Sequence, residues 1–144
     1  MAADRGSQYV LIHTPRGRDA EIAASLLKEV GVSAVKALDL TQFEKLLSND
    51  TWFALLTDET LRSGDMRSIA AWIANQPAWS DLPFIVLTQR GGGPERNPNA
   101  ARLSEMLRNV TFLERPFHPT TFVSVARTAL NGRRHQFDAR ALIA

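Results

Sequence analysis

Cysteine is absent from the 144 residues of the chain. Its absence excludes disulfide frameworks, thiolate nucleophiles and cysteine-based zinc sites, and it agrees with a reducing, cytoplasmic location. Long apolar runs are also absent, since none approaches the ~20 residues of a membrane span, and the start of the chain lacks the basic-then-apolar order of a secretory signal. We therefore expect a cytoplasmic protein without a membrane partner.

Lysine is missing from the second half of the chain, residues 73–144, which nevertheless carries nine arginines against five acidic residues. Guanidinium groups dock carboxylates and phosphates at two points, so this excess suits fixed ion pairs or phosphate contacts. Arg133, Arg134 and Arg140 are too few to form a basic groove, and no base-reading motif accompanies them. Nucleic acid is not an expected partner.

Short apolar runs alternate with amphipathic segments along the whole chain. Helices are indicated from Asp19, the expected cap, to Gly31, after a capping box at Thr41 and Glu44, around residues 66–75, around residues 103–107, and from Pro119 onward. Strands are indicated at residues 9–12, 32–38, 52–56, 83–88 and 110–113. Five continuous apolar strands alternating with five helices predict an α/β fold, a doubly wound parallel sheet covered on both faces.

In such a sheet the functional crevice lies beyond the carboxyl ends of the strands. The residues that follow the predicted strands are therefore the candidate site: His13, Thr14 and Pro15 after the first strand, Thr57 and Asp58 after the third, Thr88 after the fourth and Arg115 after the fifth. The glycine-rich run at residues 89–98 is expected to be a mobile linker. No histidine pair, serine elbow or nucleotide loop is present, so no catalysis, metal or cofactor is expected.

At these strand ends the sequence resembles the receiver domain of bacterial two-component response regulators. The most specific likenesses are residues 83–88 (PFIVLT), similar to a fourth strand ending in a switch Thr/Ser, and residues 112–117 (FLERPF), similar to the aromatic-x-x-Lys-Pro-Phe pattern after the fifth. The resemblance implies a flavodoxin-like sheet of order 2-1-3-4-5, a cis peptide at Arg115-Pro116, and Phe112 as the switch aromatic. Residues 56–59 (LTDE) and 76–83 (QPAWSDLP) resemble an atypical subgroup associated with histidine kinase systems.

The family uses an acidic pair after the first strand and an Asp after the third to hold Mg²⁺ while that Asp accepts phosphate. Here Thr14 and Pro15, or His13 and Thr14 if the register moves by one, stand at the acidic pair. Neutral side chains supply neither the charge nor the hard oxygens that Mg²⁺ needs. Arg115 replaces the usual Lys and is expected to pair with Asp58 in place of phosphate. The resemblance thus implies a degenerate phosphorylation pocket.

Two registers of the third strand remain open. Alignment on residues 55–56 selects Thr57 as the phosphoacceptor position, whereas counting from Gly31 selects Asp58. If Asp58 is the acceptor, the alternative function is a working phosphoreceiver with an unorthodox cation site.

Helix-compatible sequence continues beyond the point where a receiver usually ends. We expect a receiver-like domain over residues 1–132 and a helical extension or tail over residues 133–144. The expected surface for partners lies on this last helix. The leading hypothesis is a pseudo-receiver, not an enzyme, that binds a histidine kinase or other signalling protein, or dimerises, without phosphorylation. The side chains expected on that surface are Phe122, Arg133, Arg134, Phe137 and Arg140.

Overall fold

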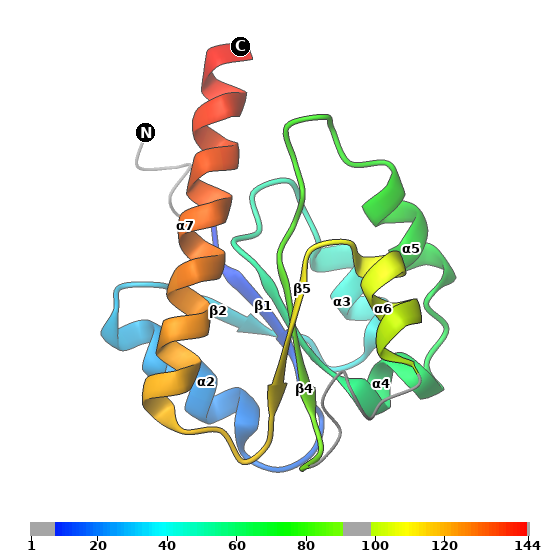
Figure 1. Cartoon of the computed structure of the whole chain (residues 1–144), viewed down its shortest axis with the longest axis vertical. Coiled ribbons are helices and arrows are strands. Elements are labelled where there is room, and N and C mark those ends of the chain that lie inside the picture. The colour runs from blue at the N-terminus through cyan, green and yellow to red at the C-terminus, as the bar shows by residue number, and fades with distance from the viewer. Residues whose placement is uncertain (1–7, 91–98, 144) are drawn as a thin grey trace.

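Five strands form one parallel sheet in the order β2-β1-β3-β4-β5, as the resemblance to receiver domains implies (Figure 1). A computed structural model describes residues 8–90 and 99–143. The expected mobile linker lies largely outside the described residues, because 91–98 are not among them. The strands are β1 (Val10–His13), β2 (Ala34–Lys36), β3 (Ala54–Thr57), β4 (Phe84–Thr88) and β5 (Val110–Glu114).

Six helices connect and cover the strands in the described ranges, one more than the sequence predicts. The additional helix, α4, begins directly after β3, and residues 64–66 separate it from α5. Its six residues carry no apolar period that a sequence reading could detect. The helices are α2 (Asp19–Glu29), α3 (Leu40–Leu46), α4 (Asp58–Ser63), α5 (Arg67–Ala74), α6 (Ala100–Leu107) and α7 (Pro119–Ile143).

The two faces of the sheet carry separate apolar cores. On one face, Val10, Ile12 and Leu55 pack with residues of α2 and α7. On the other, Leu11 and Leu56 pack with residues of α3, α4, α5 and α6. Every residue of β1, β3 and β4 is buried, which explains why these strands read as continuous rather than alternating apolar runs.

Two predicted helix starts differ from the structure. The capping box lies two residues earlier than Thr41, because Asp39 accepts a hydrogen bond from the amide of Gln42 (2.8 Å) and the Gln42 side chain accepts one from the amide of Leu38 (2.6 Å). Asp19 is the first residue of α2 rather than its cap. Its carboxylate is instead directed to Arg115, as described below.

The last helix, α7, is continuous for 25 residues and passes through Gly132 without a break. The domain boundary drawn at that residue therefore falls inside a helix. Figure 1 shows α7 running back past the sheet, so that its C-terminal turns project at the end of the molecule opposite the tip of β5. None of the described helices combines the length and hydrophobicity needed to cross a membrane.

Candidate functional site

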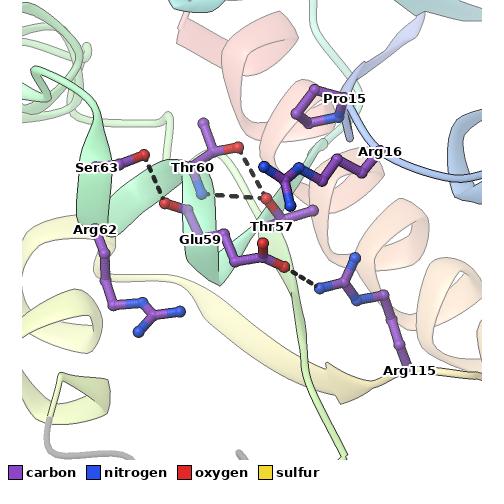
Figure 2. A pocket seen from close by; sticks show the side chains of 8 residues that line it. All are labelled: Pro15, Arg16, Thr57, Glu59, Thr60, Arg62, Ser63 and Arg115. Carbon is purple, nitrogen blue, oxygen red and sulfur yellow. Dashed lines mark hydrogen bonds and ion pairs between the residues drawn. The ribbon is translucent and has the colours of Figure 1, made fainter.

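A pocket of about 540 Å³ lies at the edge of the sheet where β1, β3 and β5 end (Figure 2). The loop after β1, the helix α4 and the residue after β5 supply its walls. Three guanidinium groups and three hydroxyl groups dominate the lining, so the pocket is polar and rich in positive charge. Its lining residues are Pro15, Arg16, Thr57, Glu59, Thr60, Arg62, Ser63 and Arg115.

Arg115 forms ion pairs with two acidic residues from different elements. Its Nη2 lies 2.5 Å from Oε1 of Glu59, and its Nη1 lies 3.5 Å from Oδ2 of Asp19. The expected pair with Asp58 was wrong, because the chain turns into α4 immediately after Thr57 and carries Glu59 rather than Asp58 towards Arg115. The hydrogen bond from Arg115 lowers the pKa of Glu59, and the positive charges of Arg115 and Arg16 lower it further. Glu59 is therefore a carboxylate at neutral pH.

Hydroxyl groups form the wall contributed by α4. The Oγ1 atom of Thr57 caps this helix by accepting a hydrogen bond from the amide of Thr60 (3.2 Å), and it lies 2.8 Å from the Thr60 hydroxyl. Ser63, one turn further on, donates to the carbonyl of Glu59. Residues 57, 60 and 63 share one side because they are three apart. This spacing is visible in the sequence, but it has meaning only once a helix is known to begin there.

Asp58 is not among the residues that line the pocket. Its carboxylate is almost buried, with 10% of the side chain exposed, and its Oδ1 lies 3.6 Å from Nε of Arg62. Of the two candidate phosphoacceptor positions, Thr57 is the one on the pocket. Arg62, together with Arg16, was not identified from the sequence, because neither residue follows a strand directly.

The remaining residues of the predicted pocket lie at the same edge but mostly behind its surface. Pro15 lines the pocket. His13 is buried, and its Nδ1 donates to the carbonyl of Ala37 (2.9 Å), so it belongs to the packing of β1 against β2. Thr14 and Thr88 are buried, and their hydroxyls have no hydrogen-bond partner within the described ranges. Phe112 is half-buried against the core under α5 and α6, and the Arg115-Pro116 bond is cis, as the resemblance implies.

A divalent cation of the kind used by receiver domains does not fit these residues. Mg²⁺ requires several hard oxygen ligands with compensating negative charge. The loop after β1 supplies Thr14, Pro15 and Arg16, and the carboxylates of Asp58 and Glu59 are each paired with an arginine. In the described part of the chain, no three acidic or histidine side chains gather as a metal site would need.

The C-terminal helix does not present the surface that the sequence suggests. Arg133 is completely buried, and its guanidinium donates four hydrogen bonds: to the carbonyls of Asn49 (2.8 Å) and Thr51 (2.9 Å) and to the side chains of Ser80 (2.8 Å) and Gln136 (2.7 Å). Asn49 and Thr51 precede β3 and Ser80 precedes β4, whereas Gln136 lies on α7 itself. Arg133 thus anchors α7 to the end of the sheet opposite the pocket.

Aromatic rings complete this anchor. The guanidinium carbon of Arg133 lies 4.9 Å from the ring centre of Phe137 and 5.6 Å from that of Trp79, and Arg140 contacts the same two rings while pairing with Asp50 (2.8 Å). Such contacts add to the binding of a cation. Burial, together with the neighbouring positive charge of Arg140, lowers the pKa of Arg133 to about 10, so Arg133 stays protonated at neutral pH.

Most of the expected partner surface is therefore internal packing. Phe122 is fully buried in the core between α7 and the sheet, with its ring 5.2 Å from that of Phe117. Phe137 and Arg140 are half-buried, and only Arg134 is exposed among the residues predicted for that surface. The exposed apolar side chains of α7 lie instead at its end, where Leu142 is 89% and Ile143 is 72% exposed.

The strand order, the two helical layers and the pocket beyond the carboxyl edge are the architecture of response regulator receiver domains. The solved structures that this chain resembles belong to that class. A receiver domain protein from Clostridium thermocellum superposes with a TM-score of 0.67 at 15% identity, covering 88% of this chain and 97% of that one.

Two further structures extend the likeness. NtrX from Brucella abortus in complex with ADP has a TM-score of 0.70 at 18% identity, covering 92% of this chain but 29% of that longer one. The beryllofluoride-activated NtrC4 receiver domain dimer has a TM-score of 0.63 at 21% identity, covering 88% and 98%. No family model and no curated protein matches the sequence. The chain has the receiver-domain fold, and at these identities the comparisons establish the fold alone.

Proposed function

We propose that this chain is an atypical receiver-type signalling module that works by contact with another protein and does not accept phosphate. The observation that carries the proposal is the chemistry of the pocket: Arg16 follows β1 and Arg115 follows β5, and each carboxylate near them is paired with a guanidinium. Aspartyl phosphorylation of the receiver type needs a bound divalent cation, and these residues offer it no adequate ligand set. The proposed role is that of a non-enzymatic component of a two-component system in the cytoplasm.

The end of α7 is the contact surface that we assign to this function, and we propose a second copy of the chain as its partner. Leu142 and Ile143 stand exposed on helical turns that project beyond the sheet (Figure 1). Arg134 and Asp138 are exposed one turn apart on the same helix, so antiparallel copies would place opposite charges across the contact. The NtrC4 receiver domain, which has the same fold, is a dimer in its beryllofluoride-activated form, which supports this choice. A histidine kinase or another signalling protein would then be engaged by the dimer.

Beryllofluoride is expected to cause no Mg²⁺-dependent change in the protein. In amide correlation spectra, the signals of Asp58 and Thr88 should show no shift that depends on Mg²⁺ when both reagents are added, because the described residues offer no cation site to hold the phosphate mimic on Asp58. A saturable shift that requires Mg²⁺ and disappears in Asp58→Asn would contradict the proposal. That result would establish the alternative, a working phosphoreceiver that uses Asp58.

Dimerisation through α7 is expected to depend on its apolar end. Light scattering should give a concentration-dependent dimer for the intact chain and a monomer for the double variant Leu142→Glu/Ile143→Glu, because two carboxylates would have to be buried in the contact. The matched control is Ser124→Glu/Thr128→Glu, which adds the same charge at exposed positions earlier on the same helix. It should remain a dimer. If the intact chain were a monomer, or if the two double variants had the same oligomeric state, the proposal that α7 is the contact surface would be wrong.

A further inference from the structure

Arg16 is a cation on the pocket that makes no hydrogen bond or ion pair within the described residues. Its side chain is exposed, and no hydrogen bond or ion pair joins it to another residue of the described chain. The other two arginines of the pocket are each held by acidic residues, Arg62 by Asp58 and Arg115 by Glu59 and Asp19. One guanidinium with unused donors therefore reaches the pocket from the loop after β1.

Figure 2 shows how the charged groups lie around the centre of the pocket. Arg16 and Arg115 approach from one side, Glu59 lies between them, and the hydroxyls of Thr57 and Thr60 face the same space. The influence of Arg16 on Glu59 is consistent with this view, since the positive charge of Arg16 helps to lower the pKa of the Glu59 carboxyl. The Glu59 carboxylate thus occupies a position where two guanidiniums and hydroxyl donors favour an anion.

We propose that this pocket is a binding site for a phosphate-type oxyanion, either inorganic phosphate or the phosphate group of a small ester, held non-covalently and without a metal ion. Arg16 and Arg115 would each donate two guanidinium hydrogen bonds to the oxyanion, and the hydroxyls of Thr57 and Thr60 would donate to its oxygens. Glu59 would leave Arg115 as the ligand enters. Its side chain is one-third exposed, so it can turn to solvent without being buried elsewhere.

The volume of the pocket indicates the size of ligand that it can hold. A volume of about 540 Å³ lies within the range of small-molecule sites and exceeds what one phosphate group fills. The remaining space is lined by Arg62, Ser63 and Pro15, which offer polar contacts to the body of an ester. The proposal goes beyond the contact function of α7 and does not depend on it. The pocket is lined from α4 and the carboxyl ends of the strands, and these elements lie at the opposite end of the molecule from the last turns of α7 (Figure 1).

Calorimetric titration of the intact chain with inorganic phosphate, in the presence of a metal chelator, tests this proposal. Saturable binding is expected, with a Kd that rises about tenfold or more in Arg16→Gln, because a charge-assisted pair is lost. Glu59→Gln should tighten binding by roughly tenfold, since it removes the competing carboxylate. Glycerol phosphate serves as the ester probe, and tighter binding of this probe than of phosphate would identify an ester as the natural class.

Arg18→Gln is the matched control. Arg18 is two residues from Arg16 and 82% exposed, pairs with Glu21, and does not line the pocket, so its loss should leave the Kd unchanged. Absence of saturable binding in both the intact chain and Glu59→Gln would overturn the proposal. Equal weakening by Arg16→Gln and Arg18→Gln would also overturn it, since that outcome means general charge attraction. The chelator separates this test from that of beryllofluoride, which requires Mg²⁺.

Discussion

Replacing Arg133 by Ala is expected to lower the free energy of unfolding by about 3–5 kcal/mol, because it removes one partner from a buried polar network. The carbonyls of Asn49 and Thr51 and the hydroxyl of Ser80 would each lose a hydrogen bond from the guanidinium. The rings of Trp79 and Phe137 would also lose the cation that packs against them. Since small domains are stable by only about 5–15 kcal/mol, this is a large fraction of the total. Urea unfolding followed by circular dichroism measures it.

Two further variants make this result specific. Arg134→Ala changes the adjacent residue, which is exposed, and should alter stability by no more than about 0.5 kcal/mol. Arg133→Lys keeps the positive charge but not the planar guanidinium. Its free energy of unfolding should therefore lie between those of the wild type and Arg133→Ala. If Arg133→Ala were as stable as Arg134→Ala and lost only self-association, Arg133 would be a residue of the partner surface after all.

Replacing Phe122 by Ala is expected to cost about 3–5 kcal/mol in the free energy of unfolding, through the apolar area and the cavity that it leaves. Phe122 is completely buried where α7 packs on the sheet, and its ring contacts that of Phe117. Urea denaturation should show a lower midpoint with an unchanged slope, because the wild type and the variant expose a similar amount of surface on unfolding.

The neighbouring exposed residue provides the control for Phe122. Thr121→Ala should leave the midpoint nearly unchanged. Phe122→Leu keeps most of the volume and should fold even if Phe122→Ala does not, with a smaller loss of stability. A stable Phe122→Ala protein would show that this side chain does not belong to the core.

The two variants matter because the sequence placed both residues on a surface for partners. Apolar side chains of the last helix pack on the sheet as far as Leu130. Beyond Leu130, the residue type of Arg133 predicts an exposed side chain, because arginine is rarely buried unless its donors are satisfied. Three of its four hydrogen-bond partners come from loops more than fifty residues earlier in the chain. No local pattern reports such contacts.

In the pocket, too, some features could be predicted from the sequence and others could not. The strand ends could be found from apolar runs and turn residues, so Pro15, Thr57 and Arg115 were correctly brought to one edge of the sheet. The pair between Arg115 and Glu59 could not be found, because it depends on the chain entering a helix at Asp58. Whether a carboxylate points to a pocket or to its own helix is decided by that single turn, which reverses the roles expected for Asp58 and Glu59.

The sequence by itself determined the fold class and the strand positions, because burial on both faces forces continuous apolar strands, and helical spacing marks the segments that cover them. It also determined that residues 13–16, at the end of the first strand and directly after it, include no carboxylate. Only the tertiary structure decided which charged side chains meet. Ion pairs such as Arg115 with Asp19 and Glu59, and the anchoring of Arg133, join residues that are distant along the chain. Their energies depend on distance and burial, which only the packed chain defines.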